Sequence, residues 1–369
     1  MNNSNSYERY HRQLILPKFG EAAQQKLLKA RVLVVGAGGL GCPILQYLTA
    51  AGVGTIGIVD DDTVQLNNLQ RQVLYSVNDL GLPKADRASS ILNQLNSEIQ
   101  ILPFNQRLTN ENALRLFEEF QIIVDASDNF PTRYLINDSC AFLKKPLVFG
   151  AISQYEGQLS IFRNETANDV NYRDLFPQPP KDGEVLSCAE GGVLGVLAGI
   201  IGTMMANETI KLITGIGSPL INRLLTFNSL NNQFYELSLS VRPECRSLIP
   251  KTAGEFEKRD YEWLCSSQLT NKEIDAGTFN NFIANEQADV IDVREPNELP
   301  EVNEFSNMKI PLSTLAGNTS GIKSNTVVTF CQTGKRSIQA VQILDTIFNG
   351  SKRIYSLKGG ILEWKKQKQ

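Results

Sequence analysis

The chain has 369 residues, of which 42% are hydrophobic and 20% charged, and its formal net charge is −3. Since domains average about 150 residues, this length predicts two domains, each with its own core. The small acidic charge provides no basic field for a phosphate backbone, so nucleic acid is not an expected partner.

Neither a secretion signal nor a membrane span is expected. The N-terminal segment MNNSNSYERYHRQ lacks an apolar core, and the longest apolar stretch, Gly191 to Ala206, has 16 residues with five glycines. The six cysteines are scattered without a CxxC pair, which indicates reduced thiols and predicts a cytoplasmic protein. A single histidine, His11, excludes mechanisms that need several imidazoles.

The first half of the chain alternates apolar runs with helix patterns. Residues 31–35 predict a strand, 36–41 a glycine turn, 42–53 a helix and 55–60 a second strand. Further buried strands are predicted at 100–104, 121–127 and 146–151. The pattern predicts an α/β fold, a Rossmann-like, mostly parallel sheet with flanking helices.

Two later features interrupt this alternation. Residues 164–187 contain four prolines or glycines and no clear periodicity, which predicts a long surface loop. Beyond it, Gly191, Gly195 and Gly199 recur every four residues and place a glycine stripe on one helix face. The stripe favours close helix packing, and a subunit contact is the alternative.

The α/β pattern restarts near the C-terminus. Strands are predicted at 288–293, 326–331 and 353–360, and a helix at 337–348. We therefore expect a first domain over 1–247, a linker over 248–265 and a smaller α/β domain over 266–369.

Gly36, Gly38 and Gly41 form a GxGxxG motif between a strand and a helix, with Gly39 inside it, and Asp60 follows 19 residues after Gly41. Bare backbone lets a phosphate approach the helix N-terminus, and an acidic residue at this distance can bind ribose hydroxyls. Alone, the motif indicates NAD, and a purely structural turn is the other alternative.

The polar residues that follow favour a triphosphate. Arg71 and Lys84 can offset phosphate charge, and Asp128, in the segment DASDN after a strand, can hold Mg²⁺. Each of these residues alone is typical of a solvated surface. Their combination at the ends of strands is what predicts a nucleotide site.

Several motifs over residues 7–247 resemble the ubiquitin-activating-enzyme superfamily: RYHRQLIL, GAGGLG, IVDDDTVQLNNLQRQ, PKA, DASDN and SCAEGGV. The most similar branch is that of the adenylyltransferases of molybdopterin and thiamine biosynthesis. The resemblance implies ATP over the glycine loop and, as substrate, the Gly-Gly tail of a ubiquitin-like sulfur-carrier protein.

The resemblance also implies residue roles. Asp60 would contact the ribose, Asn68, Arg71 and Lys84 the phosphates, and Asp128, followed by Asn129, the Mg²⁺. It implies a homodimer in which Arg12 reaches the partner subunit's ATP.

Two cysteine positions complete the first domain. Cys188 matches a motif cysteine that forms a thioester or persulfide link in some relatives, but a cysteine before an apolar helix is equally compatible with a core position. Relatives often hold zinc with two CxxC pairs. Here Asn171, Asp174 and Leu248 stand at three of the four positions, with Cys245 at the fourth, so no structural zinc is expected and packing alone should hold this region.

The second domain contains the segment CQTGKRS, Cys331 to Ser337, between a strand and a helix. Backbone N–H groups turned inward, with Lys335, Arg336 and the helix dipole, should lower the thiol pKa and hold a thiolate or persulfide. A buried structural cysteine is the alternative.

This segment, with DVREPNEL at 292–299 and GGILEW at 359–364, resembles a rhodanese domain over about 268–366. The resemblance implies Cys331 as a persulfide carrier that receives sulfur from a persulfide or from thiosulfate. The whole chain is thus expected to be an enzyme, an adenylyltransferase joined to a sulfurtransferase. An NAD-dependent oxidoreductase and a non-enzymatic ATP-binding scaffold are the rival hypotheses.

Overall fold

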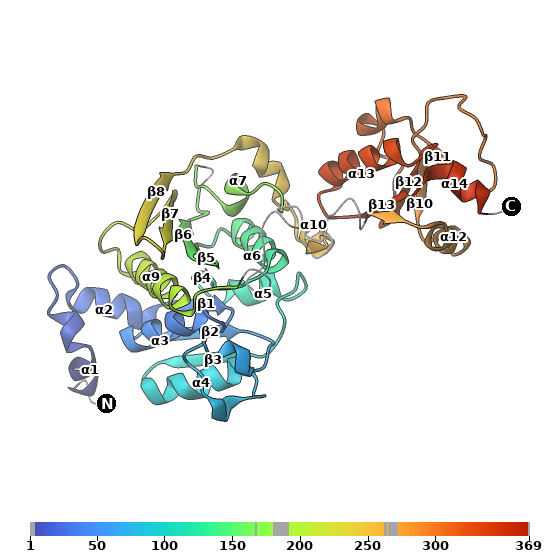
Figure 1. The fold of residues 1–369 in the computed structure, drawn as a ribbon. Coiled ribbons are helices and arrows are strands. Elements are labelled where there is room, and N and C mark those ends of the chain that lie inside the picture. Colours follow the sequence, from blue (N-terminus) through green and yellow to red (C-terminus); the bar gives the residue numbers. More distant parts are fainter. Residues whose placement is uncertain (1–3, 167, 180–191, 262–263, 265–271, 368–369) are drawn as a thin grey trace. The chain divides into compact units, whose positions relative to one another are not determined.

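The computed structural model describes residues 4–166, 168–179, 192–261, 264 and 272–367. The chain divides into two compact units, one of residues 1–178 and 186–251 and the other of residues 179–185 and 252–369. Each unit has its own sheet and its own core (Figure 1).

The first unit is built on a sheet of eight strands in the order β3-β2-β1-β4-β5-β6-β7-β8. The strands are β1 (Arg31–Val35), β2 (Thr55–Val59), β3 (Gln100–Phe104), β4 (Ile122–Asp125), β5 (Leu147–Ser153), β6 (Glu156–Phe162), β7 (Arg223–Asn228) and β8 (Gln233–Ser238). The first five in this order are parallel, and the last three extend the sheet in antiparallel fashion. The predicted α/β fold class is confirmed.

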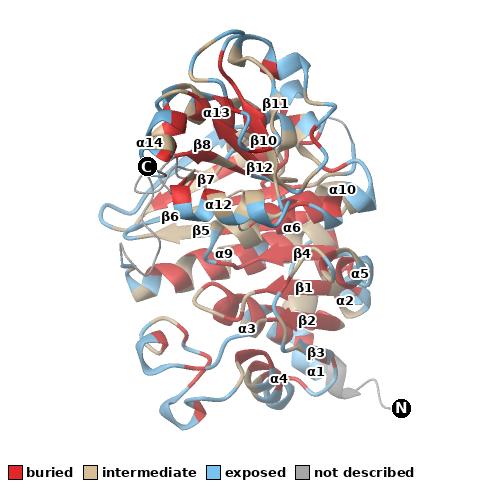
Figure 2. Ribbon diagram, turned by 90° about the vertical axis from the view of Figure 1, so that its right-hand side faces the viewer, coloured by how far each residue is buried: buried red, intermediate tan, exposed pale blue. Residues whose placement is uncertain are grey.

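The helices of this unit are α1 (Ser4–Leu14), α2 (Gly20–Lys29), α3 (Gly41–Ala51), α4 (Lys84–Leu95), α5 (Ala113–Glu118), α6 (Phe130–Leu143), α7 (Tyr172–Leu175) and α9 (Gly195–Thr214), with the 3₁₀ turns η1 (Leu66–Asn68), η2 (Val77–Asp79) and η3 (Pro243–Leu248). Helix α3 packs against α9 beside β1 and β5, and α5 packs against α6 (Figure 1). Figure 2 shows β1, β2 and β4 in the buried colour, as expected for parallel strands covered on both faces.

The antiparallel strands β6, β7 and β8 were not predicted from the sequence. All six residues of β8 are exposed, including Phe234, Tyr235 and Leu237. Strand β8 has no buried face, so its folding does not require the alternation of apolar and polar residues from which a strand is predicted.

The predicted surface loop over 164–187 is wrong in its described part. Residues 172–175 form α7, and Tyr172 and Arg173 are almost fully buried. Arg173 makes a two-point ion pair with Asp138 of α6, with Nε–Oδ1 and Nη2–Oδ2 distances of 2.7 Å each. A buried charge needs such a partner, which is why a polar segment can lie in the interior here.

Helix α9 contains part of the predicted glycine stripe, and its glycines differ in their surroundings. A Cβ at Gly195 would lie 2.2 Å from the backbone oxygen of Gln70, whereas Gly199 faces open space. Close packing therefore explains Gly195 but not Gly199, and Gly191 lies outside the described residues.

By length and composition alone, α9 is the one described helix that could cross a membrane, with 44% of the apolar window buried. Leu197, Ile201 and Met205 of this helix are fully buried, and Met205 packs directly on Gly150 of β5. Helices in protein cores pack in this way.

The second unit has a parallel five-stranded sheet in the order β11-β10-β12-β13-β9. Its elements are α10 (Ala253–Glu257), β9 (Glu273–Ile274), α12 (Ala276–Ala284), β10 (Asp289–Asp292), β11 (Met308–Lys309), η4 (Leu312–Gly317), β12 (Thr326–Phe330), α13 (Lys335–Phe348), β13 (Arg353–Leu357) and α14 (Gly360–Lys366). Phe279 of α12 and Trp364 of α14 belong to one apolar cluster, and Val341 and Leu344 of α13 belong to another. The predicted second α/β domain is confirmed.

Candidate functional site

The glycine turn between β1 and α3 leaves no room for a side chain at Gly36 or at Gly41. Gly36 has φ +99°, and a Cβ there would lie 2.7 Å from the carbonyl oxygen of Ala126. A Cβ at Gly41 would lie 2.0 Å from the oxygen of Gly36. Glycine is needed at both positions because any larger residue would push the turn away from the end of β4.

Asp60 lies just after β2 and holds this turn in place. Its Oδ2 accepts a hydrogen bond from the Ala37 N–H at 2.7 Å, and its Oδ1 accepts one from the Asp62 N–H at 2.9 Å. Burial raises the pKa of Asp60, and the charge of Lys84 opposes that rise. The side chain is only partly buried, and each oxygen keeps a lone pair for a ligand hydroxyl.

Lys84, the first residue of α4, is 4% exposed. Its Nζ donates to Oδ2 of Asp62 at 2.8 Å, and its backbone oxygen accepts from the hydroxyl of Tyr75 at 3.3 Å. The same hydroxyl lies 2.9 Å from the oxygen of Ala37 in the glycine turn. Tyr75 thus ties the start of α4 to the turn, and nothing in its sequence surroundings indicates this role.

The loop around η1 covers the turn from a second side. The aliphatic stem of Arg71 lies 3.5 Å from the position of a Cβ on Gly39, and its Nη1 donates to the oxygen of Asn67 at 3.1 Å. Asn68 is buried, accepts the Gln65 N–H at 3.3 Å and donates to Asn67 Oδ1 at 3.0 Å. Arg71 therefore lies over the glycines, while the Asn68 amide mainly closes its own turn.

The residues that follow β4 form a third part of the surroundings of the glycine turn. Asp125 is fully buried, and its Oδ1 accepts both the N–H of Ser127 at 2.9 Å and its hydroxyl at 2.6 Å. Burial raises the pKa of Asp125, against the opposing charge of Arg133. The next acidic residue, Asp128, is exposed. Asn129 is exposed as well, and its Oδ1 caps α6 by accepting the N–H of Thr132 at 2.9 Å.

Two buried oxygens near these segments have no hydrogen-bond partner: Oδ2 of Asp125 and Oε1 of Gln72. The amide nitrogen of Gln72 lies 3.6 Å from the position of a Cβ on Gly38. Unpaired buried oxygens are costly and are common where a ligand supplies the partner. Sequence reasoning did not assign Gln72 or Asp125, although both lie inside quoted motifs.

Strands β1, β2 and β4 are neighbours in the sheet, and chain order reverses direction at β1. The glycine turn, Asp60 and the Asp125 turn all follow the C-terminal ends of these strands. Ligands of open α/β sheets bind at this switch point. The structure thus brings Gly36, Asp60, Arg71 and Lys84 together, with Asp128 on the turn that abuts Gly36.

Two predicted residues are not part of this assembly as described. Arg12 is exposed on α1. Cys188 lies outside the described residues, so its role stays a prediction.

The sequence predicted that packing alone holds the region where relatives have CxxC pairs. The structure shows that hydrogen bonds hold it as well. Asp174 Oδ2 accepts the N–H of Asn171 and Oδ1 accepts that of Arg242, both at 2.8 Å, and Arg246 Nη2 lies 3.4 Å from Oδ2. Burial raises the pKa of the adjacent Cys245, with the charge of Asp174 contributing. A carboxylate therefore joins α7 to η3. Among the described residues, no group of three His, Cys, Asp or Glu is placed to hold a metal ion.

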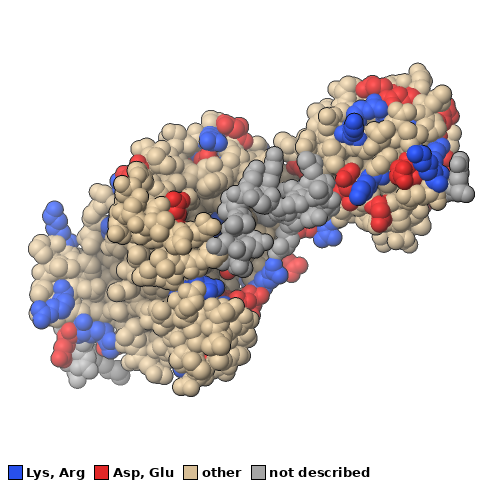
Figure 3. Space-filling view, viewed as in Figure 1, with Lys and Arg blue, Asp and Glu red and all other residues tan. Residues whose placement is uncertain are grey.

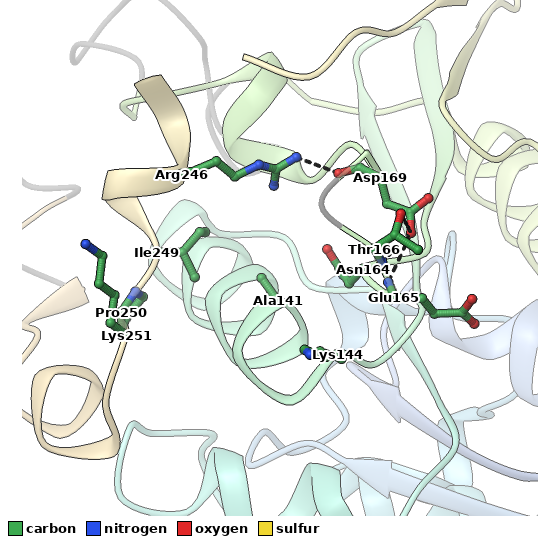
Figure 4. Close-up of a pocket in the computed structure, with 10 residues that line it drawn as sticks. All are labelled: Ala141, Lys144, Asn164, Glu165, Thr166, Asp169, Arg246, Ile249, Pro250 and Lys251. Carbon is green, nitrogen blue, oxygen red and sulfur yellow. Dashed lines mark hydrogen bonds between the residues drawn. The ribbon is translucent and has the colours of Figure 1, made fainter. Parts of the chain in front are cut away.

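A cavity of about 380 Å³ also borders this region (Figure 4). Its lining residues are Ala141, Lys144, Asn164, Glu165, Thr166, Asp169, Arg246, Ile249, Pro250 and Lys251. Figure 4 shows Arg246 reaching the backbone of Asp169, where Nη2 donates to the oxygen at 2.6 Å. None of the predicted site residues lines this cavity.

On the face in Figure 3, basic and acidic side chains are interspersed.

The second candidate site is the loop that joins β12 to α13. The Cys331 sulfur accepts the Gly334 N–H at 3.2 Å and lies 3.6 Å from the Ser337 hydroxyl. Burial raises the pKa of Cys331, but hydrogen bonds from Ser337 and from backbone N–H groups outweigh it, so the pKa lies below its ordinary value. Cys331 is 1% exposed, yet it lies in a polar loop that favours a thiolate.

The segment GGILEW supports this loop from α14. The Ile361 N–H donates to the oxygen of Cys331 at 2.8 Å. Gly360 has φ +64°, and a Cβ there would lie 2.6 Å from the same oxygen. The glycine thus lets α14 begin directly against the cysteine loop.

The charge around Cys331 differs from the expectation. Arg336 donates from Nη1 and Nη2 to the two carboxylate oxygens of Glu298, at 2.5 and 2.6 Å, so its charge is balanced within the unit. Lys335 is exposed. The lowered pKa of Cys331 therefore rests mainly on hydrogen bonds, and the positive charge expected from Arg336 is largely cancelled.

Comparisons with known proteins match both parts of the chain. Residues 10–247 match the ThiF family and residues 275–367 the rhodanese-like domain. A sulfur carrier protein adenylyltransferase of Thermus thermophilus is 48% identical over 264 residues, which are 70% of this chain and 96% of that protein. The probable adenylyltransferase/sulfurtransferase MoeZ of Mycobacterium tuberculosis is 40% identical over 375 residues, 98% of this chain and 93% of that protein.

The adenylyltransferase and sulfurtransferase MOCS3 of Culex quinquefasciatus is 38% identical and covers 98% of this chain and 88% of its own length. Among solved structures, E. coli MccB with MccA-N7isoASN has a TM-score of 0.58 at 22% identity, over 66% of this chain and 74% of that one, which shows a shared fold. The resemblance stated from the motifs is confirmed: the chain belongs to the ThiF family and carries a rhodanese-like domain at its C-terminal end.

Proposed function

We propose that this enzyme uses ATP to adenylate the C-terminal Gly-Gly carboxylate of a ubiquitin-like sulfur-carrier protein and then delivers sulfur from a persulfide on Cys331. One relative is named a sulfur carrier protein adenylyltransferase, and relatives that span nearly the whole chain are named adenylyltransferase and sulfurtransferase. The observation that carries the proposal is the pairing, in one chain, of a glycine turn covered by Arg71 with a Cys331 sulfur that accepts hydrogen bonds from Gly334 and Ser337.

At the first site, a carrier carboxylate oxygen attacks the α-phosphorus of ATP, and pyrophosphate leaves with the electrons of the broken P–O bond. A carboxylate needs no general base at neutral pH, so the site has to position the reactants and offset charge. We assign this task to Arg71 and Lys84, and the Gly36–Gly41 turn would give the phosphates access to the N-terminus of α3.

We further propose that Asp128 holds Mg²⁺ together with phosphate oxygens. Its carboxylate is exposed on the turn that abuts Gly36, and Mg²⁺ commonly takes only one or two protein carboxylates when phosphates supply the other ligands. When bound, the ion would reduce the negative charge of the triphosphate.

At the second site, the outer sulfur of the Cys331 persulfide attacks the acyl-adenylate carbonyl, and AMP leaves. A low-molecular-weight thiol then cleaves the resulting acyl disulfide, which releases the thiocarboxylate and leaves a disulfide on Cys331. Tethering the two units raises the local concentration of persulfide near the activated acyl group.

Three further features complete the proposal. The exposure of Arg12 on α1 is compatible with a homodimer in which it reaches the partner subunit's ATP. The thiocarboxylate would serve molybdopterin or thiamine biosynthesis. Reduced cysteines suit a cytoplasmic location.

ATP–pyrophosphate exchange with a panel of purified carrier proteins tests the first step. We expect exchange that depends on one carrier and on Mg²⁺, and its loss in Arg71→Ala but not in Arg115→Ala, an exposed arginine on α5. Binding of NAD with no exchange for any carrier would instead favour an oxidoreductase.

Cys331→Ser tests the sulfur step. We expect adenylation to continue while thiocarboxylate formation stops. If thiocarboxylate forms at the same rate with a low-molecular-weight persulfide as donor, the second unit only binds partners and the relay through Cys331 is wrong.

A further inference from the structure

The segment after β10 makes two direct contacts with the loop that carries Cys331. Both guanidinium Nη atoms of Arg336 donate to the carboxylate of Glu298, and the amide of Gln332 donates to the backbone oxygen of Leu299 at 3.2 Å. Glu298 therefore belongs to the immediate surroundings of the sulfur site, although 33 residues separate it from Cys331 in the sequence.

Glu298 is charged under all ordinary conditions. Its hydrogen bonds from Arg336 lower the pKa of this carboxyl to about 2. The pKa of Arg336 is raised, first by the hydrogen bonds to Glu298 and also by the charge of Cys331. This cation in the first turn of α13 is thus already neutralised by a carboxylate.

A second arginine of this region, the buried Arg294, is neutralised in the same way. Arg294 donates from Nε to Asp292 Oδ1 at 2.8 Å and from Nη2 to Oδ2 at 2.6 Å, and its Nη1 donates to the oxygen of Pro300 at 2.9 Å. Within Cys331 to Ser337, the described groups that remain for an incoming anion are the exposed Lys335 and the backbone N–H groups of the loop, which are dipoles and not full charges.

We propose that Glu298 is a specificity-determining residue of the Cys331 site, which disfavours dianionic sulfur donors such as thiosulfate and leaves less charged persulfides as the preferred donors. The inference rests on the proposed function of Cys331 as a persulfide carrier. The selection is a difference between donors that arises because Glu298 neutralises Arg336, so a dianion meets less positive charge than it would beside an unpaired guanidinium.

The reaction in which the donors compete is the loading of Cys331. With thiosulfate, the thiolate attacks the outer sulfur, a new S–S bond forms as the old one breaks, and sulfite leaves with the electron pair. With a persulfide, the same attack releases a thiolate. Thiosulfate brings two negative charges to the Arg336–Glu298 pair, whereas cysteine persulfide brings fewer.

The test measures sulfur transfer from each donor to cyanide by the full-length chain. Cyanide removes the outer sulfur from loaded Cys331 as thiocyanate and regenerates the thiolate. For Glu298→Gln we expect kcat/KM for thiosulfate to rise by about tenfold or more, while the value for cysteine persulfide changes less than about twofold. The KM of this variant for thiosulfate should also rise with salt, because the released charge of Arg336 is screened.

Two further variants separate charge from geometry. Glu298→Asp keeps the charge and should keep the donor preference of the original chain. Glu301→Gln removes an exposed carboxylate of the same segment that accepts only a weak 3.4 Å contact from Asn303, and it should change neither donor.

A parallel loss with both donors in Glu298→Gln would show that Glu298 only holds the loop, and unchanged kinetics would show that its charge has no effect; either result overturns the inference. If the original chain transfers sulfur from neither donor above the level of Cys331→Ser, the proposed sulfurtransferase function fails first, and the inference fails with it.

Discussion

The Oδ2 atom of Asp60 accepts a hydrogen bond from the backbone N–H of Ala37 at 2.7 Å, which joins the end of β2 to the second residue of the glycine turn. An acidic residue predicted to contact the ribose thus also fixes the turn over which the phosphates would lie. Burial raises the pKa of the Asp60 carboxylate, and the positive charge of Lys84 opposes this rise. One side chain thus both holds the glycine turn and interacts with the charge of Lys84.

Replacing this carboxylate should affect both stability and ATP use. In Asp60→Ala the Ala37 N–H loses its partner, so we expect the first unit to lose about 1–3 kcal/mol of unfolding free energy and the KM for ATP to rise. Urea unfolding and ATP–pyrophosphate exchange measure the two effects. Asp61→Ala removes the exposed neighbouring carboxylate and should change neither.

The glycine turn should tolerate substitution unequally. Since a Cβ at Gly41 would lie 2.0 Å from the Gly36 oxygen, Gly41→Ala has to displace the turn, and a shift of about 1 Å at a reacting group can cost about 100-fold in rate. At Gly38 the nearest atom is Gln72 Nε2 at 3.6 Å, an ordinary contact, so Gly38→Ala should lose much less exchange activity. Equal losses would contradict the steric reading of the turn.

The ion pair between Arg173 and Asp138 should dominate the stability of its region. Both side chains are 0% exposed, so Asp138→Ala would leave a buried guanidinium without its carboxylate, at a cost of about 3–5 kcal/mol. The exposed pair Arg223–Glu236 is the matched control, and Glu236→Ala should cost about 1 kcal/mol or less. Urea unfolding of the first unit measures the loss of unfolding free energy in each variant. Similar losses in Asp138→Ala and Glu236→Ala would show that burial of the ion pair does not matter.

The pH profile of sulfur transfer should report the thiolate of Cys331. Because hydrogen bonds from Ser337 and backbone N–H groups lower its pKa despite burial, the rate should rise with pH and level off below the ordinary cysteine value of 9.0. Ser337→Ala should move the midpoint to higher pH and reduce the rate at neutral pH. Ser351→Ala, at the far end of α13, serves as control, and an unmoved midpoint in Ser337→Ala would remove Ser337 from this role.

The Glu298–Arg336 pair should give the second unit an acid-sensitive share of its stability. The pKa of Glu298 is lowered from 4.5 to about 2, so the pair's contribution is complete above pH 4.5 and disappears as the pH falls toward 2. The difference in unfolding free energy between the original chain and Glu298→Gln should therefore shrink over this interval. A difference that stays constant down to pH 2 would show that another group is responsible.

Local patterns were enough to predict the parts of both sites that are continuous in sequence. The strand, glycine turn and helix around Gly36 to Gly41, and the cysteine loop from Cys331 to Ser337, are each built by neighbouring residues. Their backbone geometry depends on glycines and on the start of a helix, and both are visible in the sequence. The alternation of apolar runs likewise predicted the parallel strands.

Contacts between distant segments were decided only by the tertiary structure. Tyr75 reaches Ala37 across 38 positions, and Arg336 meets Glu298 across another 38. Whether a side chain binds a ligand or a neighbouring group depends on what folds against it, and single-residue patterns do not contain that information. The sequence thus determined which chemical groups each site has, whereas the fold decided their pairing and therefore the charge that a substrate meets.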